Sequence, residues 1–513
     1  MHWSRRWVIA VSGLCTAAGL WVGSAQADVT MPRVFGNDMV IQRDMPIPVW
    51  GWADAGEKVT VRLDDAEVAT TATDKGEWMV KLPAQSAGGP HKMTIAGKNT
   101  IELTNILAGE VWVCSGQSNM EMGVRMCKDA NQEIAAADYP QIRLFMVDKK
   151  TSGYPLNDVN GGWRVCSPTT IAANGWGGFS AAAYYFGREI HKTLNVPVGL
   201  IDTSWGGTRI EPWTPPEGFA AVPALKGIVE TIEKVNSDYP KVYAKALDQL
   251  EAAIPAARKA LADGKPLPAL PAMPRHPLDH EQQPTGLYNA MVKGVVPFAI
   301  RGAIWYQGES NLGEGMMYYE KMKGLIAGWR KVWSQSDMPF YFVQLAPYRY
   351  GGDPTKLPGI WEAQTAVLAV PNTGMAVTTD VATVNDIHPP DKQTVGKRLA
   401  LWALAKTYGK SELVYSGPLY KSMRIEGNKV RISFNHVGSG LASHDGKELS
   451  WFEIAGTDKN YVKAKAAIDG DTVMVWAEGV SQPTAVRFGW HELAEPNLMN
   501  KEGLPASPFR AEK

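Results

Sequence analysis

The segment from Ile106 to Met120 constrains the fold more than any other part of the chain. Its first nine residues, Ile106 to Cys114, are mostly apolar, as is typical of a strand buried within a sheet. The run stops at Gly116-Gln-Ser-Asn-Met120, and a helix can begin from Glu121 onward. A buried strand that leads directly into a helix predicts an α/β fold.

The turn in this segment also suggests chemistry. A serine on a strand-to-helix turn directs its hydroxyl away from the sheet edge, close to the first N–H groups of the helix. Such N–H groups can hold the oxyanion that forms during acyl transfer. The turn is not a G-x-S-x-G elbow, because Met120 stands where the second glycine would be. The alternative is that Ser118 merely caps the helix.

Residues 108–411 continue the alternation of strands and helices. Buried strands are predicted at 142–147, 197–202, 303–306 and 340–345, and a helix at 180–194 with Ser180 as its N-cap. The alternation predicts a parallel sheet, whose ligands bind beyond the carboxyl ends of the strands. Residues 217–285, a charged helix followed by a proline-rich stretch, are interpreted as an insertion packed beside the core.

Both flanks of this region are predicted to be all-β. In residues 28–107, segments 48–52, 58–62, 77–81 and 91–95 mix apolar with polar or small residues, and turn residues separate them. In residues 412–513, similar segments occur at 429–434, 471–476 and 484–490. Short strands at this spacing favour a β-sandwich or jelly roll.

The first 27 residues have the pattern of a secretory signal peptide. Arg5 and Arg6 precede an apolar run over 7–22, and Ser24-Ala-Gln-Ala27 provides a cleavage site. No later stretch is long and apolar enough to span a bilayer. We therefore expect cleavage after Ala27 and export of a soluble protein to the periplasm or beyond the cell.

The charge balance, the metal-binding motifs and the cysteines indicate which partners, metal sites and disulfides to expect. Lys plus Arg equal Asp plus Glu at 52 each, so no overall field favours nucleic acid or acidic membranes. No CxxC or HExxH spacing predicts a metal site. In an exported protein a disulfide can form, and Cys127–Cys166 is the favoured pair because Cys114 lies in the apolar strand.

Four segments at the ends of apolar runs carry groups that ester cleavage needs. The serine at 118 is the first, and the Gly206-Gly207 pair, whose N–H groups suit an oxyanion, is the second. The third supplies the Gln307 amide, and the fourth supplies His388 as a base with Asp386 to orient its ring. Singly, each has a structural explanation as a turn or a solvated side chain. Together they provide nucleophile, oxyanion donors and base.

These motifs carry a family resemblance. The order Gly-Gln-Ser-Asn-Met, Gly-Gly-Thr, Trp-Tyr-Gln-Gly-Glu-Ser-Asn and Asp-Ile-His-Pro resembles the sialate O-acetylesterases of the SGNH-hydrolase superfamily. Residues 39–43, 48–52 and 287–291 match as well. The resemblance implies a three-layer α/β sandwich with accessory β segments and a serine esterase that uses no cofactor.

The resemblance also implies roles for single residues. Ser118 would be the nucleophile and His388 the general base. The N–H groups of Ser118 and Gly207, with the Gln307 side chain, would form the oxyanion hole. Asp386 lies two residues before His388 rather than three, so a dyad oriented by a backbone carbonyl or by Asp380 is an alternative to a triad.

The expected substrate is an O-acetylated sugar or glycan, with O-acetylated sialic acid as the first choice. Recognition of its carboxylate would need a cation near the serine, and Arg125 and Arg209 are the candidates. Trp205 is a further candidate for substrate binding. An acetylxylan or other plant-polysaccharide acetylesterase is the alternative substrate class. A non-catalytic carbohydrate-binding protein is the alternative of another kind, although the intact Ser118, Gln307 and His388 argue against it.

Overall fold

A computed structural model describes residues 28–513. The predicted signal peptide, residues 1–27, lies outside the described residues. Over residues 28–513, none of the helices combines the length and the apolar character that a membrane crossing requires.

A large mixed sheet forms the centre of the molecule, in the order β13-β12-β11-β7-β10-β8-β9. All neighbours in this row are parallel except β8 and β9. The strands are β7 (Thr100–Gly116), β8 (Tyr139–Met146), β9 (Trp163–Cys166), β10 (Val198–Asp202), β11 (Gly302–Tyr306), β12 (Phe340–Val343) and β13 (Thr373–Ala376). The four strands predicted between β7 and β13 are present. β13 was not predicted, because Thr-Gly-Met-Ala carries only a weak apolar signal.

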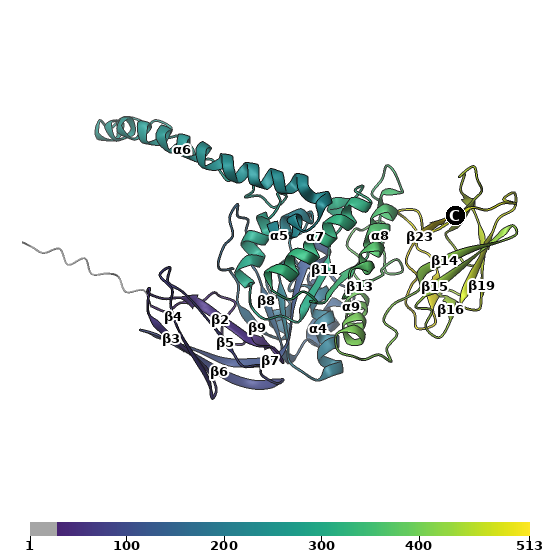
Figure 1. The fold of residues 1–513 in the computed structure, drawn as a ribbon, viewed down its shortest axis with the longest axis horizontal. Coiled ribbons are helices and arrows are strands. Elements are labelled where there is room, and N and C mark those ends of the chain that lie inside the picture. Colours follow the sequence, from purple (N-terminus) through teal and green to yellow (C-terminus); the bar gives the residue numbers. More distant parts are fainter. Residues whose placement is uncertain (1–27) are drawn as a thin grey trace, which may run out of the picture.

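Helices pack on this sheet in two groups (Figure 1). One group is α4 (Ala181–Leu194) with α9 (Lys392–Lys406), and the other contains α5 (Pro216–Ala220), α7 (Met316–Val332) and α8 (Lys356–Ala366). The predicted cap of α4 is confirmed, since the Ser180 side chain accepts a hydrogen bond from the Ala183 N–H. Short helices are α1 (Ser118–Glu121), α2 (Ala130–Ala135), α3 (Pro168–Ile171), η1 (Val124–Met126), η2 (Glu211–Trp213), η3 (Pro223–Leu225), η4 (Tyr288–Val292), η5 (Lys293–Val295), η6 (Glu309–Asn311) and η7 (Val367–Ala369).

The strand β7 joins the central sheet to the N-terminal strands. Its first half pairs with β6 and β1, and its second half pairs with β10 and β11. The N-terminal strands are β1 (Val40–Gln42), β2 (Ile47–Trp52), β3 (Lys58–Leu63), β4 (Ala66–Thr71), β5 (Glu77–Leu82) and β6 (Gly88–Ala96). Their buried side chains belong to the same hydrophobic core as those of the central sheet. This continuity fixes the position at which β7 delivers Ser118.

The C-terminal strands form antiparallel sheets around a core of their own. One sheet has the order β14-β15-β20-β19, another the order β18-β17-β21-β23, and β16 pairs with β22. The strands are β14 (Leu419–Glu426), β15 (Lys429–Asn435), β16 (Leu441–Ser443), β17 (Phe452–Ala455), β18 (Val462–Lys463), β19 (Lys465–Asp469), β20 (Thr472–Trp476), β21 (Ala485–Phe488), β22 (Leu498–Asn500) and β23 (Phe509–Glu512).

The sequence led us to expect that the inserted segment, residues 217–285, packs beside the core. The structure differs, because the segment does not pack on the core over its whole length. Its long helix α6 (Lys226–Ala262) extends away from the body of the molecule (Figure 1), and Ile232 is its one buried residue. Near that residue a small cluster with Phe219, Leu225 and Leu278 anchors the base. A helix of this length spans roughly 55 Å, so its far end outreaches the core.

Candidate active site

Three of the four predicted segments meet at one edge of the central sheet. β11, β7 and β10 are adjacent and parallel, so the turns that follow them emerge together. Gly116 sits in the first turn with φ +143°, and a Cβ there would lie 2.2 Å from the Tyr306 carbonyl oxygen. Glycine is therefore required at this position, since it lets β7 turn beside β11 before the chain enters α1.

The fourth segment brings His388 to the serine. His388 Nε2 lies 2.9 Å from Ser118 Oγ, although the residues are 270 positions apart. Ser118 does not cap its helix, because Gln117 is the N-cap residue and no side-chain cap bond is formed. The structural alternative for this serine, an ordinary helix cap, is therefore wrong. The pair has the geometry of a nucleophile held by its general base.

The surroundings of His388 favour its neutral form. The imidazole packs edge-on against Trp176, with ring centroids 4.8 Å apart. Burial and the positive charge of Lys392 lower the pKa of His388, while the carboxylates of Asp386 and Glu121 act in the opposite direction. A neutral imidazole at pH 7 can accept the proton of the serine hydroxyl.

Asp386 lies beside His388 but does not have the geometry of a buried triad aspartate. Its Oδ1 accepts a hydrogen bond from the His388 backbone N–H at 2.9 Å and lies 3.8 Å from Nδ1 of the ring. The Asp386 side chain is 64% exposed. The alternative partner, Asp380, forms a two-pronged ion pair with Arg398 instead. Asp386 is therefore the nearer carboxylate, held in place by a backbone contact.

A buried polar network that the sequence reasoning missed connects the segments that carry Ser118 and His388. Asn119 Nδ2 donates to the carbonyl of Ile387 at 2.9 Å and to Glu309 Oε1 at 2.6 Å. Lys392 Nζ donates to Asn119 Oδ1 at 2.6 Å. Burial lowers the pKa of Lys392 to about 8 and raises that of Glu309. Asn119 and Glu309 stood in the quoted motifs and so were visible, whereas Lys392 follows no recognisable pattern.

The Gly206-Gly207 turn lies directly against the serine. The Gly206 N–H donates to Glu121 Oε2 at 2.6 Å, and a Cβ on Gly206 would lie 3.1 Å from the Cβ of Ser118. Gly207 has φ +75°, which glycine adopts without strain. Among the described residues, no acceptor bonds the N–H groups of Ser118 or Gly207. These two donors remain available for an oxyanion.

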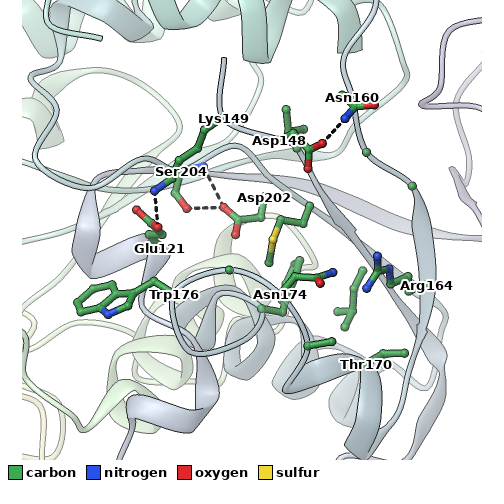
Figure 2. Close-up of a pocket in the computed structure, with 18 residues that line it drawn as sticks. Glu121, Asp148, Lys149, Asn160, Arg164, Thr170, Asn174, Trp176, Asp202 and Ser204 are labelled. Carbon is green, nitrogen blue, oxygen red and sulfur yellow. Dashed lines mark hydrogen bonds and ion pairs between the residues drawn. The ribbon is translucent and has the colours of Figure 1, made fainter. Parts of the chain in front are cut away.

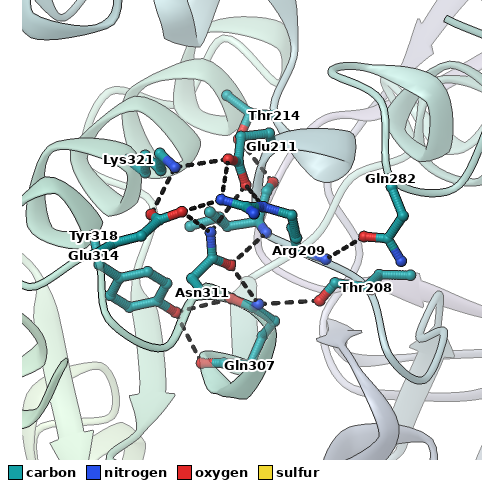
Figure 3. Close-up of polar contacts among 11 residues, drawn as sticks. Thr208, Arg209, Glu211, Thr214, Gln282, Gln307, Asn311, Glu314, Tyr318 and Lys321 are labelled. Carbon is teal, nitrogen blue, oxygen red and sulfur yellow. Dashed lines mark hydrogen bonds and ion pairs between the residues drawn. The ribbon is translucent and has the colours of Figure 1, made fainter. Parts of the chain in front are cut away.

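Gln307 is not free to act as the third donor in this structure. Its side chain is fully buried, and Nε2 donates to the Thr208 carbonyl at 3.1 Å and to Asn311 Oδ1 at 2.8 Å. Its Oε1 accepts from the hydroxyl of Tyr318 (Figure 3). Both amide hydrogens are therefore used. Instead of the predicted oxyanion role, Gln307 has a structural role, because it connects the turn that contains Thr208 to the turn that contains Asn311.

The predicted substrate-binding residues have other surroundings. Arg209 pairs with Glu211 at 3.2 Å and with Glu314, so its charge is neutralised locally (Figure 3). Arg125 is exposed on η1. Trp205 is half-buried, its backbone N–H donates to the Gly116 carbonyl, and Lys149 Nζ lies 5.6 Å from its ring centroid. Because its guanidinium is already paired with the carboxylates of Glu211 and Glu314, Arg209 is not available to bind the carboxylate of a ligand.

The predicted disulfide between Cys127 and Cys166 is not formed. The three cysteines of residues 28–513 are free and buried. The Cys127 thiol points to the Gly123 carbonyl and the Cys166 thiol to the Ala137 carbonyl, so the two sulfurs are engaged at different places in the fold. Across the same residues, no group of three His, Cys, Asp or Glu side chains is arranged to hold a metal ion.

Comparisons with known proteins agree with a sugar esterase. Residues 108–258 and 277–405 match the family model described as carbohydrate esterase, sialic acid-specific acetylesterase. The chain is 33% identical to the sialate O-acetylesterase of Rattus norvegicus over 427 residues, which cover 76% of this chain and 75% of the rat protein. The human enzyme of that name is 30% identical over 455 residues, or 82% and 79% of the two chains.

A solved structure is similar over almost the whole chain. The crystal structure of a carbohydrate acetylesterase from Xanthomonas citri aligns with a TM-score of 0.80 at 34% identity. The alignment covers 95% of this chain and all of the other. The similarity therefore includes the flanking β segments as well as the central sheet.

Proposed function

The chain belongs to the sialic acid-specific acetylesterase family of carbohydrate esterases, and from this premise we propose that Ser118 and His388 are its catalytic pair. It is a carboxylic ester hydrolase that removes O-acetyl groups from carbohydrates. The single observation that carries the assignment is the distance of 2.9 Å between His388 Nε2 and Ser118 Oγ.

Catalysis begins when His388 Nε2 takes the proton of the serine hydroxyl as Oγ attacks the acetyl carbonyl. The oxyanion accepts hydrogen bonds from the N–H groups of Ser118 and Gly207. The imidazolium then gives its proton to the sugar oxygen, and the sugar leaves as an alcohol. Water, activated by the same imidazole, hydrolyses the acetyl-serine and releases acetate. Asp386 stabilises the imidazolium across 3.8 Å.

The proposed substrate is O-acetylated sialic acid. This choice is supported by the family and by the names of the rat and human relatives, which are sialate O-acetylesterases. We also retain export through the N-terminal segment and a division into residues 28–107, 108–411 and 412–513, with the middle part as an SGNH-type esterase unit. The polar contacts of Ser118 with its neighbours all fall within that middle part.

The test is acetate release from p-nitrophenyl acetate, O-acetylated sialic acid and acetylated xylan by wild type, Ser118→Ala and Ser115→Ala. Ser115 is a matched control, because it lies in β7 three residues before Ser118 and its buried hydroxyl has no hydrogen-bond partner among the described residues. We expect Ser118→Ala to lose several orders of magnitude in turnover and Ser115→Ala to remain active. Near-normal turnover in Ser118→Ala would refute the catalytic pair, and preference for xylan would refute the sialate substrate.

A further inference from the structure

A cavity of about 890 Å³ opens beside the catalytic pair (Figure 2). It is lined by segments 144–149, 160–164 and 170–179 and by the end of β10, with Glu121 from α1. Two lining residues reach the catalytic centre directly. Trp176 packs against the His388 ring, and Glu121 accepts the hydrogen bond of the Gly206 N–H. The cavity is therefore the neighbouring space into which a sugar can extend when its ester lies at Ser118.

The lining is rich in groups that bind hydroxyls. Asp202 and Ser204 lie at the end of β10, where the Ser204 hydroxyl donates to Asp202 at 2.6 Å. Asp148 accepts a hydrogen bond from Asn160 (Figure 2). Carboxylates, amides and hydroxyls that converge on a pocket orient polar ligands through directed hydrogen bonds. A polyhydroxylated ligand fits this lining better than an apolar one.

One cation in the lining has no acidic partner. Lys149 is neutralised by Glu121 at 2.6 Å, whereas Arg164, which is exposed to solvent, forms no ion pair with any of the described residues. The Asn174 side chain, turned so that its oxygen faces the guanidinium, accepts from Arg164 Nη2 at 3.0 Å. A neutral amide thus orients the guanidinium, and its charge faces solvent without an acidic partner among the described residues. Figure 2 shows Arg164 on the side of the cavity opposite Trp176.

We propose that this cavity binds the sugar of a carboxylated substrate and that Arg164 pairs with the carboxylate. The inference rests on the proposed function, because it assigns the residues that distinguish sialic acid from a neutral sugar at the same site. A guanidinium binds a carboxylate through two parallel hydrogen bonds, which gives both affinity and orientation. Asp148, Asn160 and Ser204 then serve the hydroxyl and amide groups of the ligand. Arg164 takes the role for which Arg209 is unavailable.

The test is calorimetric binding of free N-acetylneuraminic acid and of N-acetylmannosamine, a neutral sugar, to wild type, Arg164→Gln, Arg164→Lys and Lys150→Gln. Neither sugar carries an ester, so binding is measured without turnover. Lys150 is an exposed cation that follows the lining residue Lys149 in the chain but is not part of the lining, and its variant controls for the loss of one charge. We expect Arg164→Gln to weaken binding of the acid about 10- to 100-fold. Arg164→Lys should recover part of the affinity, and Lys150→Gln should stay within about twofold of wild type.

The neutral sugar should bind all four proteins alike. The proposal is overturned if Arg164→Gln binds the acid as tightly as wild type does, if Lys150→Gln weakens binding equally, or if wild type binds no acid. These outcomes are separate from a failure of the catalytic assignment, which would appear as acetate release by Ser118→Ala. Ser118→Ala should bind the acid with wild-type affinity, since the serine is outside the lining of the cavity.

Discussion

Replacing Asp386 by asparagine should reduce catalysis only modestly. The carboxylate lies 3.8 Å from Nδ1 of His388, and its side chain is 64% exposed. At that distance in a medium close to water, its attraction for the imidazolium is about 1 kcal/mol. That energy corresponds to roughly a sixfold loss in kcat/KM. In a serine protease, replacing the buried aspartate that hydrogen-bonds the catalytic histidine by asparagine lowers kcat about ten-thousandfold.

Two further variants separate charge from loop position. Asparagine keeps the oxygen that accepts the His388 backbone N–H, whereas alanine removes it. The kcat/KM of Asp386→Ala should therefore be up to about tenfold lower than that of Asp386→Asn. Asp65→Asn, in the turn between β3 and β4, is the control for the same substitution at an exposed site.

The measurement is the pH profile of kcat/KM with p-nitrophenyl acetate. Because the Asp386 carboxylate raises the pKa of His388 against the effect of burial, its removal should move the acidic limb to lower pH. A loss of a thousandfold or more in Asp386→Asn would refute this reasoning. It would mean that the carboxylate closes on Nδ1 during the reaction and acts as a full triad member.

The positions of four central strands and the meeting of three of the four motifs followed from local patterns. Apolar runs of strand length identified β8, β10, β11 and β12, and the rule that parallel strands present ligands at their carboxyl ends placed Ser118 near Gly207. His388 follows β13 at the far edge of the sheet, and its position beside Ser118 depends on a long loop. Only its motif, and not the strand pattern, pointed to it.

The partners of buried polar side chains could not be predicted in the same way. Gln307 has the residue type of an oxyanion donor, but its hydrogens are used by Thr208 and Asn311. Arg209 is neutralised by Glu314, which lies 105 positions away. Such pairings depend on which long-range neighbours satisfy each donor on burial, and sequence spacing carries no information about that. Arg164 was overlooked for the converse reason, since what marks it is the absence of an acidic neighbour among the described residues.

Two remaining predictions concern buried charges near the site. Lys392→Met removes a positive charge that lowers the pKa of His388, so the acidic limb of kcat/KM should move to higher pH. The same substitution removes the hydrogen-bond donor to Asn119 Oδ1, so the Tm should fall. An unchanged limb would contradict this. Burial raises the pKa of Asp202 to about 7 from an ordinary 3.8. Between these values the folded protein keeps a proton that the unfolded chain has lost, so stability falls as pH rises, by at most about 4 kcal/mol. Asp202→Asn keeps an oxygen for the Ser204 N–H and hydroxyl but cannot ionise. In calorimetric scans at pH 5 and pH 8, the Tm of Asp202→Asn relative to wild type should therefore be higher at pH 8, and equal differences at both pH values would show that Asp202 ionises freely in the folded state.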